Sequence, residues 1–286
     1  MKMEKHAFLI GAYKNPDYLL RLVDSLDSDK SNIYIHVNKF NDAEFSGFKD
    51  LLKGRENIYY YSVFKIKWGG SDMIKSQLFL CDEALKDESN TYFHFITGQD
   101  VLCRPLDHFL NYVEKSESNF VSYSPLSPTE YDYRYAYYSL YDLINVRSSR
   151  FLKLLNSTLV KIQSLLHVRR KSLGFSELYW GSGWWSLRRD ACKYVVAKWK
   201  NDINLQKRLR YTFAPDEMLF QNILLNSGEN FPVVNDNLRY MKWDGSPSPL
   251  TLTINDYDDI LQSGKYFARK IDPVISSSLI ERIDSE

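Results

Sequence analysis

Two neighbouring carboxylates, Asp216 and Glu217, are the residues of this chain best suited to acid–base chemistry. They follow Pro215, which suits the first position of a helix because its missing N–H costs nothing there. Negative charge on a first helical turn is favoured, and such side chains commonly accept hydrogen bonds from free backbone N–H groups. A carboxylate at a helix start is also rigidly aimed, as proton transfer requires. The sequence therefore leaves two interpretations of Glu217, a helix cap and a catalytic carboxylate.

The residues around this pair predict a strand before it and a helix after it. At 180–187 the run WGSGWWSL alternates small residues with large aromatic ones and ends in a basic pair. Trp184 and Trp185 could stack on a sugar, but adjacent strand residues point to opposite faces, so one of them must enter the core. After Glu217, apolar residues recur at helical spacing until Asn226 and Gly228 supply a stop.

The first part of the chain alternates strand and helix patterns. Strands are expected at 7–10, 33–37, 58–64, 92–96 and 120–124, with helices after residue 15, after residue 71 and at 106–115. Strands separated by helices of 10–15 residues indicate βαβ units and a mostly parallel sheet, so the fold class is α/β. Ligands of such sheets bind beyond the carboxyl ends of the strands, here at 11–13, 36–39 and 98–100. Neither a GxGxxG motif nor a P-loop occurs, which disfavours dinucleotides and common ATP-binding loops but not a sugar nucleotide.

The segment 147–171 has an unusual charge pattern. It contains seven basic residues and no acidic one, with leucine and isoleucine at helical spacing. Such a basic amphipathic helix either packs on the body of the protein or contacts a membrane surface. Both interpretations stay open on the sequence.

Bulk properties narrow the classes of partner and the compartment. The net charge is +1, so no overall field points to nucleic acid, and the aromatic share of 15% suits either a Tyr-rich core or a sugar-binding surface. The three cysteines are far apart and have no metal-ligand spacing. The apolar run at 7–12 is too short for a signal peptide, and no run approaches the ~20 residues of a membrane span. We expect a cytoplasmic protein, peripheral at the inner face of the membrane if the segment 147–171 binds there.

Five motifs in order resemble the core-2/I-branching β-1,6-N-acetylglucosaminyltransferase family, which includes the protein xylosyltransferases. The likeness runs from about residue 6 to residue 272. Its parts are WGGS at 68–71, WGSGWWSL at 180–187, APDE at 214–217, LRY at 238–240 with WDGSP at 243–247, and FARK at 267–270. The resemblance implies a single GT-A glycosyltransferase domain over 1–286, with a Rossmann-like nucleotide-sugar half at about 1–124 and an acceptor and catalytic half at about 125–286.

The resemblance also implies a mechanism. It implies an inverting glycosyltransferase in which Glu217 is the general base, and in which Arg239 and Lys270 neutralise the diphosphate of the leaving UDP. The donor is expected to be UDP-GlcNAc, with UDP-xylose as the alternative, and the acceptor a glycan hydroxyl. A carbohydrate-binding protein without catalysis is the competing interpretation. It does not explain why Glu217, Arg239 and Lys270 occur together.

The family needs no metal, and the sequence allows a check on that expectation. Asp27-Ser28-Asp29 and Asp256-Tyr257-Asp258 both have the Asp-x-Asp spacing that binds a metal in other GT-A enzymes. Neither follows the central strand at 92–96, where Gln99 and Asp100 stand instead. We interpret both pairs as solvated loop residues and expect neither a metal nor a cofactor.

The resemblance further places residues on the two sides of the site. Gly11, Asn38, Trp68 and Asp100 are expected on the nucleotide-sugar side, although family members usually have Asp where this chain has Asn38. Glu130 and Arg134 fall near charged acceptor-binding positions of the family, without a clean match in spacing. The remaining acceptor or sugar candidates are Gly181, Ser182, Trp184 and Asp216.

Overall fold

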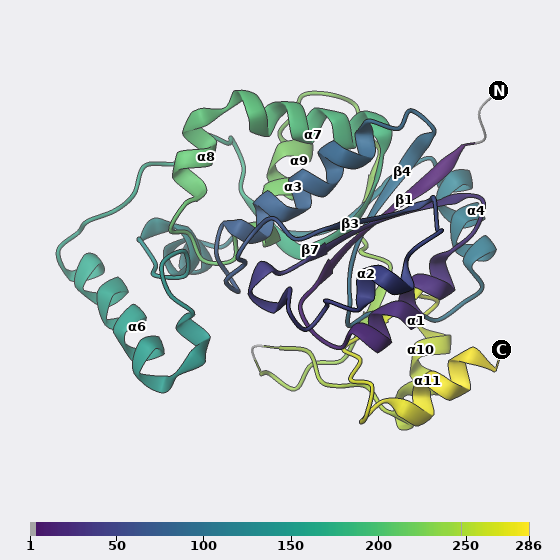
Figure 1. Cartoon of the computed structure of the whole chain (residues 1–286). Helices are drawn as coiled ribbons and strands as arrows, with labels where there is room; N and C mark the ends of the chain where they lie inside the picture. The colour runs from purple at the N-terminus through teal and green to yellow at the C-terminus, as the bar shows by residue number, and fades with distance from the viewer. Residues whose placement is uncertain (1–3, 247, 286) are drawn as a thin grey trace.

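The computed structural model describes residues 4–246 and 248–285, apart from the side chains of residues 130, 132 and 133 (Figure 1). A seven-stranded sheet runs through its centre in the order β3-β2-β1-β4-β7-β6-β8. The strands are β1 (Lys5–Ala12), β2 (Ser31–Val37), β3 (Ile58–Tyr61), β4 (Asn90–Thr97), β6 (Asn119–Pro125), β7 (Tyr179–Arg188) and β8 (Val233–Val234).

Parallel pairing dominates this sheet, which confirms the predicted α/β class. Strands β3, β2, β1 and β4 are parallel neighbours, and β6 is parallel to β8, whereas β7 runs antiparallel to β4 and β6. Strand β2 is buried along its whole length, and most of β1 is too. Continuous burial of this kind is typical of parallel strands that are covered on both faces.

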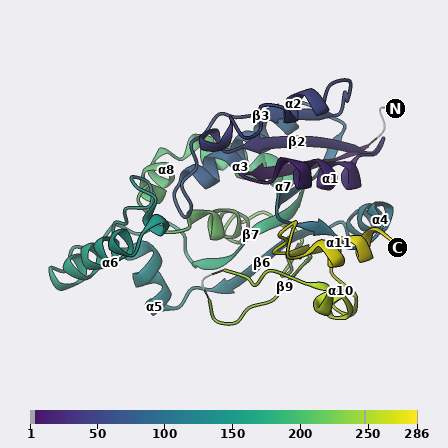
Figure 2. The same cartoon turned by 60° about the horizontal axis from the view of Figure 1, so that its bottom comes forward.

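Helices cover the two faces of the sheet (Figures 1 and 2). Phe8 and Ile10 of β1 belong to the core on one face, with α1 (Pro16–Leu26), α2 (Phe48–Leu51) and α4 (Leu106–Ser116). Ala7 and Leu9 belong to the core on the other face, with α3 (Asp72–Leu85), α7 (Arg189–Asn201), α8 (Ile203–Leu209) and α9 (Leu219–Leu225). The two-residue alternation of a strand thus supplies both cores.

A second sheet of three strands, ordered β5-β10-β9, forms where the chain returns to the end of β4. Its strands are β5 (Val101–Leu102), β9 (Arg239–Met241) and β10 (Phe267–Arg269), and β10 is parallel to β9 and antiparallel to β5. A third core packs beneath it with α10 (Tyr257–Gln262) and α11 (Ser277–Asp284). Strands from both expected halves of the chain therefore share both sheets.

The middle of the chain leaves the sheet. It forms α5 (Pro128–Tyr131), a π-helical turn at Asp132–Ala136, a short 3-10 turn at Val146–Ser148 and α6 (Arg150–Leu165). Helix α6 projects from the body in both views (Figures 1 and 2). In the described part of the chain, no helix combines the length and apolar character needed to cross a bilayer.

One predicted strand is shorter than expected. Strand β3 ends at Tyr61, whereas the pattern predicted a strand as far as residue 64. Beyond Tyr61 the chain is bonded to a side chain of β2 and not to its backbone at residues 63 and 64. His36 Nε2 accepts hydrogen bonds from the N–H groups of Val63 and Phe64. A backbone N–H only donates, so this ring nitrogen carries no proton, and burial lowers the pKa of His36 to about 4.

Candidate active site

Glu217 pairs with Arg134, a residue predicted for the acceptor side. Arg134 Nη1 donates a hydrogen bond of 2.6 Å to Glu217 Oε2, and the Glu217 side chain keeps 32% exposure. The guanidinium lies 5.0 Å from the ring centre of Trp180 and 5.5 Å from that of Phe213. The carboxylate is therefore held by a fixed cation while part of it stays accessible, as a base that receives a proton from a substrate must be.

The local backbone differs from the predicted helix start. Residues Pro215–Glu217 form a 3-10 turn, Met218 breaks the pattern with φ −142°, and α9 begins only at Leu219. The prediction of one continuous helix from Pro215 is therefore wrong, although both carboxylates lie in the first turn of the 3-10 segment, as predicted. The N-cap position of α9 is Met218, which has no side-chain cap bond, so the helix-cap interpretation of Glu217 has no support here.

Asp216 points into the protein and not toward the surface. Its side chain is buried, and its Oδ1 has no hydrogen-bond partner among the residues that the structure describes. Burial and the charge of Glu217 raise the pKa of Asp216 to about 7. A Cβ on Gly183 would lie 2.9 Å from Asp216 Oδ2, so the glycine leaves room for this carboxyl. The structure places Asp216 behind Glu217, against strand β7.

The WGGS motif holds the Glu217 turn in place. Gly69 has φ +76°, a conformation that favours glycine, and its carbonyl accepts a 2.8 Å hydrogen bond from Ala214 N. A Cβ on Gly70 would lie 2.9 Å from both the Asp142 carboxylate and the Tyr141 carbonyl. Asp142 in turn accepts from the N–H groups of Ser71 and Tyr211. The motif thus ties the first half of the chain to the segment that carries Glu217.

Lys270 lies in a group of positive side chains that we call the basic cluster: Lys14, Arg147, Arg269 and Lys270. Partial burial lowers the pKa of the Lys270 ammonium, and Lys14, Arg269 and Arg147 lower it further, with Asp272 acting in the opposite direction. Repulsion between like charges is relieved when an anion binds among them. The basic cluster therefore favours an anionic ligand.

A chain of contacts connects the basic cluster to Glu217. The Arg147 guanidinium lies 3.3 Å from the ring centre of Trp68, and that ring lies 5.7 Å from Phe213. Phe213 is also next to Arg134, the partner of Glu217. The base candidate and the basic cluster therefore belong to one continuous site.

Beneath Lys270, Asp100 is the shared counter-ion of two arginines. Its side chain is 0% exposed, and it accepts from Arg239 Nε at 3.5 Å and Arg269 Nη1 at 3.0 Å. Arg239 also donates to the carbonyls of Asn237 and Phe95, and burial lowers its pKa to about 10. Two guanidinium groups against one carboxylate leave a net positive charge under the site. Arg239 therefore adds charge from below, and Asp100 holds it there.

The residues expected on the nucleotide-sugar side lie at the strand ends and make contacts within the protein. Asn38 donates from Nδ2 to the Ile66 carbonyl at 2.8 Å and accepts at Oδ1 from the N–H of Ile66 at 3.0 Å. Its amide thus fastens the segment after β3, although the resemblance implies a nucleoside contact. Gly11 faces the ring of Phe95, which a Cβ would meet at 3.3 Å. Tyr13, just after β1, donates to Gln99 Oε1 at 2.6 Å.

Strand β7 places its candidates on different sides. A Cβ on Gly181 would lie 1.9 Å from the Ser122 carbonyl, because β6 and β7 approach closely at an irregularity in their register. Ser182 Oγ accepts from the N–H of Trp184. Trp185 enters the core and donates to Gln77, as the alternation predicted for one of the pair. Trp184 turns the other way, and the Arg269 guanidinium lies 3.9 Å from its ring centre. The side chain of Glu130 lies outside the described residues.

The two Asp-x-Asp matches differ from each other. Asp27 and Asp29 are exposed, as expected. Asp256 is buried, closes a capping box with Thr253 and pairs with Lys242 at 2.6 Å, so the prediction of a solvated loop residue is wrong for it. Within 4–246 and 248–285, no group of three or more His, Cys, Asp or Glu side chains could hold a metal ion.

Sequence reasoning missed several members of the site. Lys14 follows the predicted end of the first strand, and Arg269 adjoins Lys270, so both had a local signal. Arg147 had none, because its place over Trp68 depends on contact between segments far apart in the chain. The same holds for Asp142, which joins residues 71 and 211.

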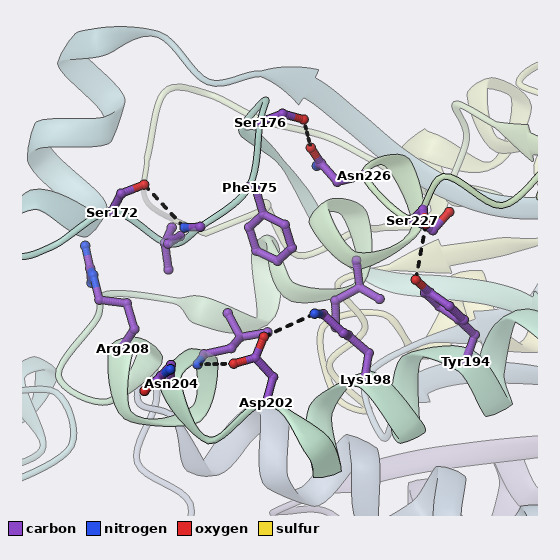
Figure 3. A pocket seen from close by; sticks show the side chains of 14 residues that line it. Ser172, Phe175, Ser176, Tyr194, Lys198, Asp202, Asn204, Arg208, Asn226 and Ser227 are labelled. Atoms are coloured by element: carbon purple, nitrogen blue, oxygen red, sulfur yellow. Dashed lines mark hydrogen bonds and ion pairs between the residues drawn. The ribbon is translucent and has the colours of Figure 1, made fainter.

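A hollow of about 620 Å³ lies apart from these residues, between the 172–176 segment, α7, α8 and α9 (Figure 3). It contains none of the predicted site residues. Several polar groups at its wall bond one another, including Lys198 with Asp202 at 3.2 Å and Ser176 with Asn226 at 2.8 Å. We assign it no part in the site.

Comparison with known proteins agrees with the motifs. The model of the family described as Core-2/I-Branching enzyme matches residues 6–261. Xylosyltransferase 1 of Rattus norvegicus and of Mus musculus are each 26% identical over 123 residues, or 37% of this chain. The match spans 15% and 13% of the length of these two relatives.

Two solved structures show weaker likeness. The apo structure of WbbM, titled a bifunctional glycosyltransferase, has a TM-score of 0.44 at 11% identity, covering 94% of this chain and 46% of its own. TarS of S. aureus has a TM-score of 0.33 at 11% identity, covering 41% of this chain and 21% of its own.

Proposed function

The chain belongs to the Core-2/I-Branching enzyme family, and from this membership we propose that it is a glycosyltransferase. The reaction is transfer of a sugar from a UDP-sugar to a hydroxyl of a glycan acceptor, with inversion at the anomeric carbon. UDP-GlcNAc is the preferred donor, because the five motifs resemble those of a family of N-acetylglucosaminyltransferases. UDP-xylose is the second candidate, and the similarity to Xylosyltransferase 1 favours it.

Glu217 is the general base in this proposal. Its carboxylate takes the proton of the acceptor hydroxyl as the hydroxyl oxygen bonds to the anomeric carbon. The bond from that carbon to the phosphate oxygen breaks on the opposite face, and UDP leaves with the electron pair. Arg134 supports this role, because its 2.6 Å hydrogen bond fixes the carboxylate in place. Arg134 is a positioning residue and leaves one Glu217 oxygen for the acceptor.

The basic cluster receives the diphosphate. Lys270 is the direct ligand, because its side chain is only partly buried and is surrounded by like charge that an anion relieves. Arg239, with all three side-chain nitrogens bonded inside the protein, contributes through its charge. Charge that is fixed before the reaction needs no reorganisation as the leaving group develops its own. The transfer then requires no divalent metal.

The observation that carries the proposal is the contact chain from Arg147 through Trp68 and Phe213 to the Arg134–Glu217 pair, with the charge of Arg147 also acting on Lys270. An inverting transfer needs a base and an anion-stabilising group on opposite sides of one carbon. A surface pair of unrelated function would not need a neighbouring cluster of surplus positive charge.

The test is release of UDP and transfer of sugar by Glu217→Gln, which keeps the shape of the side chain and removes its basicity. Turnover should fall ~10²–10⁴-fold with donor binding nearly unchanged. Glu281→Gln on the exposed face of α11 is the matched control and should keep full turnover. A Glu217→Gln variant with more than about a third of wild-type turnover would exclude Glu217 as the base. Absence of UDP release by the wild type with either donor would favour the non-catalytic alternative.

A further inference from the structure

Helix α6 carries a stripe of large apolar side chains that the protein leaves uncovered. Phe151 is 70% exposed and Leu165 is 77% exposed, and the stripe also contains Leu154, Leu155, Ile162 and Leu166. At ~100° per residue, these six positions fall within an arc of ~120° on one side of the helix. A continuous apolar stripe of this kind marks a contact surface, whereas scattered apolar residues do not.

Helix α6 attaches to the body in an unusual way, because an amphipathic helix usually packs by its apolar face. Here the attachment uses another side of the helix, where Leu152 and Leu159 are partly covered and two polar side chains bond to the body. Asn156 Oδ1 accepts from the N–H of Leu140 at 2.8 Å, and Gln163 bonds both the N–H and the carbonyl of Tyr138. These residues lie on a different sector from the stripe, so the helix is fixed with its apolar stripe turned away from the protein.

Basic residues border the stripe. Arg150, Lys153 and Lys161 lie on α6, and Arg169 and Lys171 follow it, and all five are exposed. Across residues 143–176 there is no acidic residue. The other two bases of the segment serve the protein, because Arg170 is buried against the carbonyls of residues 208, 210 and 211, and Arg147 stacks on Trp68. The structure therefore separates five outward charges from two internal ones.

We propose that α6 binds the surface of an anionic lipid bilayer. The apolar stripe enters the boundary between head groups and acyl chains, and the five exposed bases contact the anionic head groups beside it. A membrane fits better than a second copy of this chain, since a copy would bring the same five positive charges against its own. The projection of α6 from the body gives it access to a flat surface (Figures 1 and 2).

Arg147 links this surface to the proposed active site. It lies three residues before α6 and contacts Trp68, so a bilayer at α6 is held at a fixed orientation to the basic cluster. Binding to lipid does not depend on the proposed glycosyltransferase activity. It is measured without a donor, so failure of one proposal leaves the other standing.

The experiment is co-sedimentation of the full chain with vesicles of phosphatidylcholine alone and of phosphatidylcholine with phosphatidylglycerol. The wild type should bind the anionic vesicles at least ~10-fold more strongly than the neutral ones, and about 0.5 M salt should weaken the binding. The double variant Phe151→Ser/Leu165→Ser should lower binding by at least ~10-fold, because two exposed anchors are lost. Lys153→Gln/Lys161→Gln should reduce the preference for anionic lipid.

The matched control is Val274→Ser/Ile275→Ser, which removes two similarly exposed apolar side chains outside α6 and should bind as the wild type does. Equal binding of the wild type to both vesicles would overturn the proposal, as would unchanged binding by the stripe variant. Circular dichroism of each variant must match the wild type, and a stripe variant that loses α6 is replaced by Leu154→Ser/Ile162→Ser. Sedimentation velocity that shows a dimer broken by the stripe substitutions, without lipid binding, would assign the surface to a second copy.

Discussion

At the scale of single residues, the Asp216–Glu217 pair shows how neighbours acquire different properties. Glu217 is partly exposed and held by Arg134, whereas Asp216 is buried with an unpartnered oxygen in the described structure. The difference follows from the 3-10 turn, which directs successive side chains to different sides. Asp216 thus stays protonated over much of the acid range, while the Glu217 side chain remains partly open to solvent.

The raised pKa of Asp216 predicts a pH-dependent effect of Asp216→Asn on stability. In the folded protein the pKa is about 7 against an ordinary value of 3.8. The contribution of this group to the free energy of unfolding is therefore full below about pH 3.8 and is lost as the pH rises through about 7. Asparagine stays neutral, so the variant should gain stability relative to the wild type as the pH rises from about 4 to about 8.

Urea denaturation across this range measures the difference, with Asp258→Asn on the exposed side of α10 as the control. A difference between Asp216→Asn and the wild type that does not change with pH would show that Asp216 titrates normally in the folded state.

At the scale of elements, the segment after β3 depends on two side chains, one at the end of β2 and one just beyond it. His36 accepts from two N–H groups and Asn38 bonds both polar groups of Ile66, so this segment is held by side chains in place of a strand ladder. These bonds explain why β3 ends at Tyr61 although the residues beyond it favour a strand. They also give a reason for Asn where the family usually has Asp.

Asn38→Asp should therefore destabilise the protein. Aspartate cannot donate to the Ile66 carbonyl, and it places a carboxylate oxygen against that carbonyl oxygen in place of the amide N–H. The free energy of unfolding should therefore fall by ~1–3 kcal/mol. Hydrogen exchange of residues 62–67 should become faster. Asn145→Asp at an exposed turn is the control and should melt as the wild type does. An Asn38→Asp variant with unchanged melting but a changed KM for the donor would instead place Asn38 on the nucleoside.

At the scale of the whole molecule, the site is assembled from distant parts of the chain. The basic cluster combines residues 14, 147, 269 and 270, and Asp100 pairs with arginines 139 and 169 residues away. The three-stranded sheet makes this possible, because β9 and β10 bring the C-terminal part of the chain to the end of β4.

Lys270→Ala tests the anion site. A charged hydrogen bond to the diphosphate contributes ~1.5–3 kcal/mol, so kcat/KM should fall at least ~10-fold while the melting temperature changes little. Lys193→Ala on the exposed face of α7 is the matched control. Excess EDTA should leave the wild-type rate unchanged. Transfer that stops with EDTA and returns with manganese would show that a metal, and not Lys270, carries the diphosphate.

The sequence by itself determined the local elements and the residues with chemical potential. Buried strands such as β1 and β4 are short apolar runs, and their helices repeat apolar residues every three or four positions, so each pattern is complete within about a dozen residues. Pro215, Asp216 and Glu217 stand out for the same reason. Resemblance in five motifs added the family, which the match over residues 6–261 supports.

The tertiary structure alone decided which charges meet and which faces are covered. Periodicity shows that α6 has an apolar side, but the contacts that turn this side outward, such as those of Asn156 and Gln163 with residues 140 and 138, exist only in the folded chain. Asp100 looked accessible at a strand end and became a buried counter-ion because β9 and β10 cover it. Burial and ion pairing here depend on contacts between residues more than a hundred positions apart. A local sequence pattern covers only about a dozen residues, so it cannot include both partners.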